Sequence, residues 1–312
     1  MTKIRDGIIG FCVGDALGVP VEFQTRQALS AKPLTDMIGY GSHSQPAGTW
    51  SDDSSLVFCL MESLIEFPNL DLHDLADKFS SWLYKSYWTP HGVTFDVGIA
   101  TAKAIDRYKE LCIRPDLAGG TDVYSNGNGS LMRILPLAYL LKGEMIEDRV
   151  KIISQVSSVT HGHPRSIIAC VIYIEVAIHL INGLSLQEAI ERMRETVKDV
   201  YKDTNHTEMM KFDRVLNGDI SKLTVDEIES SGYVVHTLEA SLWCLLTTDS
   251  YSDAVLRAIN LGEDTDTTGA VAGGLAGLYY GIEAIPEKWI NPLARLDDIN
   301  DICNRFEAAS NA

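Results

Sequence analysis

Glycine recurs on one face of two segments whose apolar residues follow a helical period. In the first, Gly7, Gly10, Gly14 and Gly18 stand three or four residues apart, which places them on one side of a helix. Each glycine costs a helix up to about 1 kcal/mol relative to alanine, so four of them indicate close approach by another backbone. The second segment, residues 269–277, directly follows an acidic cluster. We expect the two helices to pack tightly and to bring their attached loops together.

Helical periodicity also dominates the rest of the chain. After Ser54, apolar residues recur at i, i+1, i+4, i+5, i+8 and i+9 as far as Ile65, one stripe of a helix that Pro68 ends. No stretch alternates with the period of a strand. The other predicted helices span residues 72–84, 97–111, 131–141, 152–159, 165–181, 185–201, 224–229, 235–246, 251–261 and 269–281.

This pattern predicts an all-α protein. No low-complexity linker divides the sequence, so we expect residues 1–312 to form a single compact multi-helix domain. At this length a two-lobed arrangement stays open as the alternative.

Two acidic clusters stand directly ahead of helical stretches. A carboxylate at a helix start is ordinary, but one cap uses only one side chain. The second acid of each cluster therefore leaves negative charge that a cation would balance. Hydroxyl neighbours make the combined donor set all hard oxygen, which suits Mg²⁺ or Mn²⁺ rather than Zn²⁺. The residues of this set are Ser51, Asp52, Asp53, Asp264, Asp266 and Thr267.

The net charge limits the partners of the chain. It has 26 basic and 43 acidic residues, a formal net charge of −17. A protein that binds phosphate backbones through lysine and arginine shows a basic face, so we expect no nucleic-acid partner. The acidic surplus suits solubility and divalent cations instead. The oligomeric state stays open, with a monomer favoured.

The cysteine and apolar patterns favour a cytoplasmic location. The six cysteines are far apart, form no C-x-x-C pair and mostly stand in apolar runs, so we expect buried thiols in a reducing compartment. We find no pattern of a targeting segment. The longest apolar stretch, residues 167–181, is too short for a bilayer and contains Glu175 and His179, so we expect a buried helix and no membrane partner.

Several polar residues outside the acidic clusters are open to more than one interpretation. Asp15 lies among glycines and is expected to orient other groups through buried hydrogen bonds. Glu22 follows Pro20, which ends the helix, and alone could be a solvated loop acid. Asp96 could cap the helix that follows it.

Two further loops could bind a ligand. The turn from Asn126 to Ser130 precedes a helical run, and backbone N–H groups at a helix start can cradle phosphate, although Asn-Gly turns are also common in plain loops. His161 and His163 cannot close a zinc site by themselves, so capping or substrate hydrogen bonding is favoured. No serine or cysteine stands in a nucleophile motif.

Six motifs, in this order, resemble those of the ADP-ribosylglycohydrolase family. They extend over residues 4–281 and read G-x-x-x-G-D-A-L-G with a following Glu, G-T-W-S-D-D-S, F-D-V-G, N-G-N-G-S-L-M-R, T-H-x-H-P and N-L-G-x-D-T-D-T-x-G-A-V-A-G-x-x-A-G. The resemblance implies an all-α fold around a central two-metal cleft. It also implies hydrolysis of the glycosidic bond between ADP-ribose and an acceptor side chain, on an ADP-ribosylated protein or a small ADP-riboside.

The resemblance also implies roles for individual residues. Ser51, Asp52 and Asp53 would bind one of two divalent cations, Mg²⁺ or Mn²⁺, and Asp264, Asp266 and Thr267 the other, with Asp266 as a bridge. Glu22 would be the general base or acid, with Asp96 second. The diphosphate and adjacent ribose would be held by Asn126, Gly127, Asn128, Gly129, Ser130 and His161.

Two positions depart from the family pattern. Ser51 stands where many members have threonine, and Glu263 stands where glycine is common, so its role is unassigned. Arginine-linked ADP-ribose is the favoured substrate because the motif at residues 95–98 is of the bacterial type.

The sequence also bears on three alternative functions. A serine-linked or small-molecule ADP-riboside remains open as the substrate, as does a non-catalytic ADP-ribose-binding or crystallin-like role, which the intact acids disfavour. An isoprenoid-diphosphate enzyme would need the motif D-D-x-x-D, and the residues that follow Asp53 do not complete this motif.

Overall fold

The computed structural model describes residues 3–310, and within that range the regular structure is helical, with no strand. The all-α prediction is confirmed. The α-helices are α1 (Ile4–Gly18), α2 (Arg26–Ala31), α3 (Asp52–Glu66), α4 (Leu72–Lys85), α5 (Ile99–Leu111), α6 (Pro136–Leu141), α7 (Ile146–Ser158), α8 (Pro164–Ile181), α9 (Leu186–Val200), α10 (His206–Met209), α11 (Asp213–Leu216), α12 (Val234–Leu246), α13 (Tyr251–Ile259), α14 (Thr265–Tyr280), α15 (Glu287–Ile290) and α16 (Leu296–Ser310).

Short 3₁₀ turns and isolated bridges connect these helices. The 3₁₀ turns are η1 (Val19–Val21), η2 (Gly41–His43), η3 (Pro115–Leu117), η4 (Leu131–Arg133), η5 (Met210–Phe212), η6 (Ile220–Lys222), η7 (Val225–Glu227) and η8 (Ile282–Ala284). The bridges join Tyr40 to Gln45, Gly120 to His161 and Gly127 to Tyr233.

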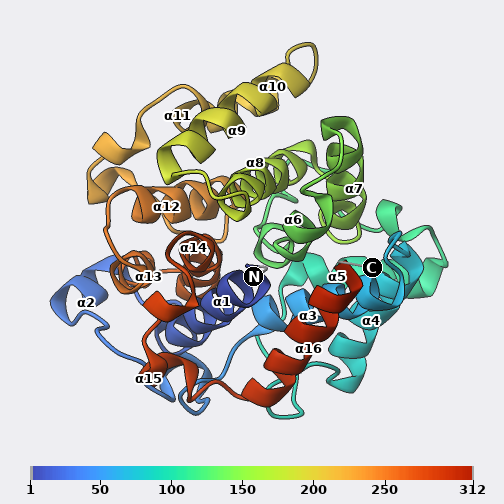
Figure 1. Cartoon of the computed structure of the whole chain (residues 1–312). Coiled ribbons are helices and arrows are strands. Elements are labelled where there is room, and N and C mark those ends of the chain that lie inside the picture. The colour runs from blue at the N-terminus through green and yellow to red at the C-terminus, as the bar shows by residue number, and fades with distance from the viewer. Residues whose placement is uncertain (1–2, 311–312) are drawn as a thin grey trace.

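The two glycine-lined helices, α1 and α14, pack against each other in the middle of the molecule (Figure 1). A Cβ atom added to Gly10 would lie 2.5 Å from the carbonyl oxygen of Gly273, and one added to Gly269 would lie 2.6 Å from that of Gly14. No larger residue fits at such distances. The predicted close backbone approach is confirmed.

The same contact joins the end of α1 to the start of α14. The backbone of Gly18 lies so near Asp266 that a side chain would overlap it, and Thr265 Oγ1 donates a hydrogen bond of 2.8 Å to the Gly18 carbonyl. The second acidic cluster is thereby held against the loop that carries Glu22.

Some predicted helices have other limits or another form. The helix predicted for residues 131–141 is divided into η4 and α6, because Pro136 has no N–H to continue an α-helix and is suited only to its first turn. The helix predicted for residues 224–229 is the single 3₁₀ turn η7. α7 begins at Ile146, before the predicted residue 152.

The terminal helix α16 was missed by the sequence analysis, although its pattern is present. Ile299, Ile302, Cys303 and Phe306 are spaced as one buried helical stripe. α16 lies beside α3 (Figure 1), and Arg305 makes two hydrogen bonds, of 2.7 and 2.8 Å, to the carboxylate of Glu62. The short helices α2, α10, α11 and α15 were also missed.

Helix α8 is long and apolar enough to cross a membrane by length and composition alone. However, 78% of its span is buried inside the protein, as expected for the core helix of a folded domain. Among the cysteines, five are buried as predicted, whereas Cys112 is exposed at the end of α5 and contradicts the general expectation.

The glycine contact generates a first prediction. Gly14→Ala would place a methyl group against the Gly269 carbonyl, and such overpacking costs about 1–3 kcal/mol or more. We expect a matching loss of unfolding free energy in urea titrations. Gly143→Ala is the control, because nothing lies within 4 Å of its added Cβ. Equal stability of the two variants would contradict the packing account.

Candidate active site

The first acidic cluster is positioned by Asp15 of α1. The Asp15 carboxylate is fully buried and accepts hydrogen bonds from Ser51 N (2.9 Å), Ser54 N (3.1 Å) and Ser54 Oγ (2.5 Å). Ser51 in turn caps α3 by accepting from Asp53 N at 3.2 Å. Asp15 thus satisfies the N–H groups of the α3 start, which leaves the side chains of Asp52 and Asp53 uncommitted to capping. Its predicted orienting role is confirmed.

The second acidic cluster meets the first at the start of α14. Thr267 Oγ1 donates to Asp53 Oδ1 at 3.4 Å, and Asn128 Nδ2 donates to Asp264 Oδ2 at 2.8 Å. Carboxylate oxygens of Asp15, Asp53 and Asp266 lie within 4.8 Å of one another, as do those of Glu22, Asp264 and Asp266. Two clusters more than 200 residues apart therefore form one acidic site.

This acidic site fits a bound cation. Asp53 Oδ2 and Asp266 Oδ2 are buried and have no hydrogen-bond partner among residues 3–310, which is costly for a charged group. Burial raises the pKa values of both carboxyls well above normal; Asp15 and Asp52 add to the effect at Asp53, and Glu22 and Asp96 at Asp266. A divalent cation would satisfy the free oxygens and offset the repulsion, and hydroxyl and carboxylate donors suit a hard ion.

An open cleft of about 240 Å³ lies over the acidic site. Predicted site residues that line it are Glu22, Asp52, Asp96, Gly127, Asn128, Gly129, His161, Asp264 and Thr267. Ser51, Asp53 and Asp266 are buried rather than lining the cleft. Asn126 and Ser130 are buried as well, and neither lines the cleft. The fold thus brings the predicted metal ligands, catalytic acids and substrate-binding residues to one place. Some of them line the cleft and the others are buried beneath it.

The glycine-rich loop differs from its predicted form. No α-helix starts after Ser130; the chain enters the single turn η4 instead, so the expected helix N-terminus is absent. The loop is held by Asn128 N, which donates to Gly232 O at 3.0 Å, and by Gly129, which packs against the His161 ring. The Asn128 side chain faces Asp264 and so links the loop to the acidic site.

A buried cation, Arg133, lies beneath this loop, and the sequence analysis assigned it no role. Its guanidinium donates to Gly129 O and to Val156 O and stacks over the Phe79 ring at 4.8 Å. No carboxylate within residues 3–310 forms an ion pair with it, and burial lowers its pKa to about 10. Its positive charge is therefore available to the loop above.

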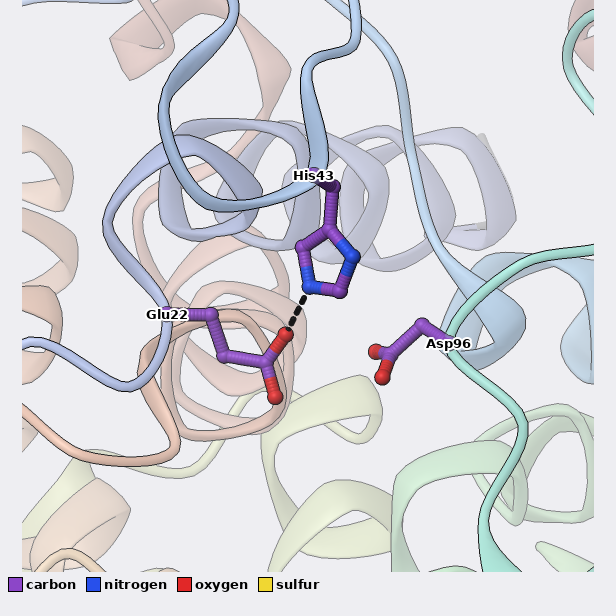
Figure 2. A group of neighbouring side chains, drawn as sticks. All are labelled: Glu22, His43 and Asp96. Atoms are coloured by element: carbon purple, nitrogen blue, oxygen red, sulfur yellow. Dashed lines mark hydrogen bonds and ion pairs between the residues drawn. The ribbon is translucent and has the colours of Figure 1, made fainter.

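Glu22 and Asp96 face each other across the cleft, and His43 lies near both and forms a hydrogen bond with Glu22 (Figure 2). Burial raises the pKa of Glu22 to about 7; Asp96 and Asp264 act in the same direction, whereas the hydrogen bond from His43 opposes it. Asp96 caps no helix, since Gly98 occupies that position of α5. His43 was missed by the sequence analysis because it lies in a loop without periodicity.

The two histidines of the T-H-x-H-P motif have separate roles. His163 caps α8 by accepting from Arg165 N at 3.2 Å, as the capping interpretation predicts. His161 lines the cleft, is 2% exposed, and contacts Thr160 Oγ1 at 2.8 Å through Nδ1. Within the described residues, neither belongs to a group of three side chains able to hold a metal.

Glu263, which directly precedes Asp264, has a left-handed backbone conformation, with φ of 64°. Its carbonyl accepts from Phe23 N and its N–H donates to Gln24 O, both at 2.7 Å. These bonds hold the strained residue beside the Glu22 loop, and its side chain is exposed.

Comparisons with known proteins show which family this chain resembles. A sequence profile described as ADP-ribosylglycohydrolase matches residues 1–312. "ADP-ribosylarginine hydrolase Tri1" of Serratia proteamaculans is 31% identical, over 98% of this chain and 79% of the relative. "ADP-ribosyl-[dinitrogen reductase] glycohydrolase" of Rhodospirillum rubrum is 31% identical, over 91% and 88%.

A more distant relative and a solved structure carry names of the same kind. "ADP-ribosylhydrolase ARH3" of Bos taurus is 24% identical over 93% of this chain and 88% of the relative. A solved structure titled "ADP-ribosylglycohydrolase-related protein complex" superposes with a TM-score of 0.81 and 29% identity, covering 99% of this chain and 98% of the other.

The charge of the acidic site generates a second prediction. Without divalent cations, Asp53→Asn removes one buried negative charge, so we expect the variant to melt at a higher temperature than the wild type in EDTA. Mg²⁺ should stabilise the wild type, by about 2.7 kcal/mol at a hundredfold excess over Kd, and should stabilise the variant much less. The exposed Asp203→Asn is the control and should behave as the wild type in both conditions.

Buried His161 generates a prediction about acid stability. Burial lowers its pKa to about 3 in the folded protein, against an ordinary value of 6.5. Below pH 6.5 the unfolded chain binds a proton that the folded chain does not, so stability falls as the pH falls toward 3. Between pH 6 and 4, the unfolding free energy of His161→Gln should fall less steeply than that of the wild type. The two slopes should differ by about 1.4 kcal/mol per pH unit. Parallel urea-derived stability curves would contradict this.

Proposed function

The chain belongs to the ADP-ribosylglycohydrolase family, and we propose that it hydrolyses the bond between ADP-ribose and an arginine side chain, releasing ADP-ribose. As a member of this family it is a hydrolase. The observation that carries the proposal is the convergence of both acidic clusters, with unpaired buried oxygens, beneath a cleft in which Glu22 faces Asp96.

The donor residues are proposed to hold two divalent cations, Mg²⁺ or Mn²⁺. Ser51, Asp52 and Asp53 would hold one, and Asp264, Asp266 and Thr267 the other. Asp266 suits a bridging place because its carboxylate lies within 4.8 Å of both Asp53 and Asp264. When bound, such a pair supplies Lewis-acid chemistry and a template for ribose hydroxyls and water.

Glu22 is proposed as the general base or acid, with Asp96 as its partner. Glycoside cleavage uses a pair of carboxyl groups, one to move the proton of water and one on the side of the leaving group. A group that transfers protons works best with a pKa near the working pH, and burial brings Glu22 to about 7. Asp96, half-buried and opposite, faces the same space.

The glycine-rich loop and His161 are proposed to hold the diphosphate and adjacent ribose. Gly127, Asn128 and Gly129 line the cleft, and Gly129 packs against the neutral His161 ring. Arg133 below the loop supplies an unpaired positive charge toward the same place. The dianion would thus meet a favourable potential although the chain as a whole is acidic.

The charge of the cleft wall supports arginine as the acceptor. No lysine or arginine lines the cleft, and each lining residue belongs to a stretch of sequence that contains neither. These stretches are residues 6–25, 33–77, 86–102, 115–132, 152–164 and 258–287. A guanidinium group would meet acids, and no lysine or arginine on the cleft wall itself would compete with it. Two relatives are named ADP-ribosylarginine hydrolases. Serine-linked and small-molecule ADP-ribosides, and binding without turnover, are the alternatives that the assay below separates.

We assign this activity to residues 1–312 as one domain, because the buried apolar residues form one continuous cluster. We further propose that the protein acts as a monomer in the cytoplasm, on an ADP-ribosylated protein or a small ADP-riboside, without membrane or nucleic-acid partners. The mostly buried α8 and the charge of −17 support this setting.

Hydrolysis assays test the proposed function. Arginine- and serine-linked ADP-ribosyl peptides should be tested with Mg²⁺ or EDTA. We expect ADP-ribose release from the arginine substrate, its loss in EDTA and Asp52→Asn, and a fall of about 10²–10⁴-fold in Glu22→Gln. Glu191→Gln, exposed on α9, is the control. Metal analysis should give about two ions per chain, following the two ligand sets.

Three results would change the proposal. EDTA-insensitive release would remove the metal mechanism, and preference for the serine peptide would change the acceptor. Binding of ADP-ribose without any turnover would favour the non-catalytic role.

A further inference from the structure

A loop between α2 and α3 is fixed onto the segment that carries Glu22. At Gly41, with φ of +59°, any side chain would overlap the carbonyl of Pro20, so the two backbones are in direct contact. Ser42 Oγ donates to the backbone carbonyl of Glu22 at 2.5 Å. These two contacts place the next residue, His43, directly over the Glu22 side chain.

The imidazole of His43 is held from three sides. Its Nε2 bonds to Oε2 of Glu22, and its ring lies between two aromatic rings, with centroid distances of 5.8 Å to Phe23 and 5.3 Å to Phe95. Phe95 directly precedes Asp96. His43 therefore contacts the loop of Asp96 through Phe95 and the loop of Glu22 through its hydrogen bond, and Figure 2 shows that hydrogen bond with Asp96 opposite.

We propose that His43 is the positioning residue of this site: its Nε2 fixes one oxygen of Glu22, and its ring sets Glu22 and Asp96 at their working separation. This inference rests on the proposed function. A glutamate carboxylate has three rotatable bonds, and holding it in one orientation avoids losing that freedom during the reaction. Oε1 accepts no hydrogen bond from the described residues, which leaves it for substrate or water.

The chemistry of the contact allows a sharp set of variants. The amide nitrogen of glutamine reaches the place of histidine Nε2, whereas that of asparagine reaches the place of Nδ1. Since the bond uses Nε2, His43→Gln should keep the donor, and His43→Asn and His43→Ala should lose it. Ser42→Ala is the matched variant for the loop, because it removes a bond to the Glu22 backbone and leaves the carboxylate contact.

The experiment measures kcat and KM on the arginine-linked ADP-ribosyl peptide. We expect His43→Ala and His43→Asn to lower kcat about 10- to 100-fold with KM within about threefold, and His43→Gln to recover most of the loss. Ser42→Ala should have a smaller effect than His43→Ala, and His73→Ala, an exposed histidine of α4, should have none. Equal kcat in His43→Gln and His43→Ala, or a loss confined to KM, would overturn the proposal.

Crystal structures of the wild type, His43→Ala and His43→Gln give a readout that does not depend on turnover. The Glu22 side chain should be ordered in the wild type and His43→Gln, and displaced or in several rotamers in His43→Ala. An unmoved Glu22 in His43→Ala would overturn the inference. Inactivity of the wild type on every ADP-riboside would overturn the proposed function instead, while the position of Glu22 would still decide whether His43 orients it.

Discussion

The contact between the glycine faces of α1 and α14 is the constraint on which the site depends. Only backbone without side chains can approach as closely as Gly10 and Gly273 do. Because of this approach, the end of α1 touches the start of α14 at Asp266, and Asp15 on α1 reaches the start of α3. One helix pair thus fixes both acidic clusters relative to each other, and the carboxylates are brought together by packing that owes nothing to their own charge.

The energy of that packing is opposed by the acids it brings together. Burial raises the pKa of the buried carboxyls here, and repulsion by neighbouring acids adds to the effect at all of them except Asp15; the five are Asp15, Asp52, Asp53, Asp264 and Asp266. The folded chain therefore holds groups that would be more stable in water. Active sites commonly keep such unfavourable groups because the surrounding structure holds them in place. Here the apolar core of α1, α8 and α14, nearly all of it inaccessible to solvent, supplies the opposing stability.

The sequence predicts those features that depend on local pattern. The all-α class, the glycine contact and the role of Asp15 follow from periodicity and residue type, and most proposed site residues do meet at one cleft. Features that depend on how loops dock were missed. His43 acquires its place only because Gly41 fits against Pro20, and Arg133 only because the chain turns at η4 instead of continuing as a helix. The missed α16 is different, since its apolar stripe was readable in the sequence.

The absence of lysine and arginine from the cleft wall has a consequence for the order of binding. Arg133 lies beneath the glycine-rich loop and not on the cleft surface, so the affinity for an anionic ligand would depend in part on whether cations already occupy the acidic site. By thermodynamic reciprocity the ligand must then also strengthen cation binding by the same factor. With the proposed cations bound, the cleft would hold a diphosphate more tightly, and loss of either ligand would weaken the binding of the other.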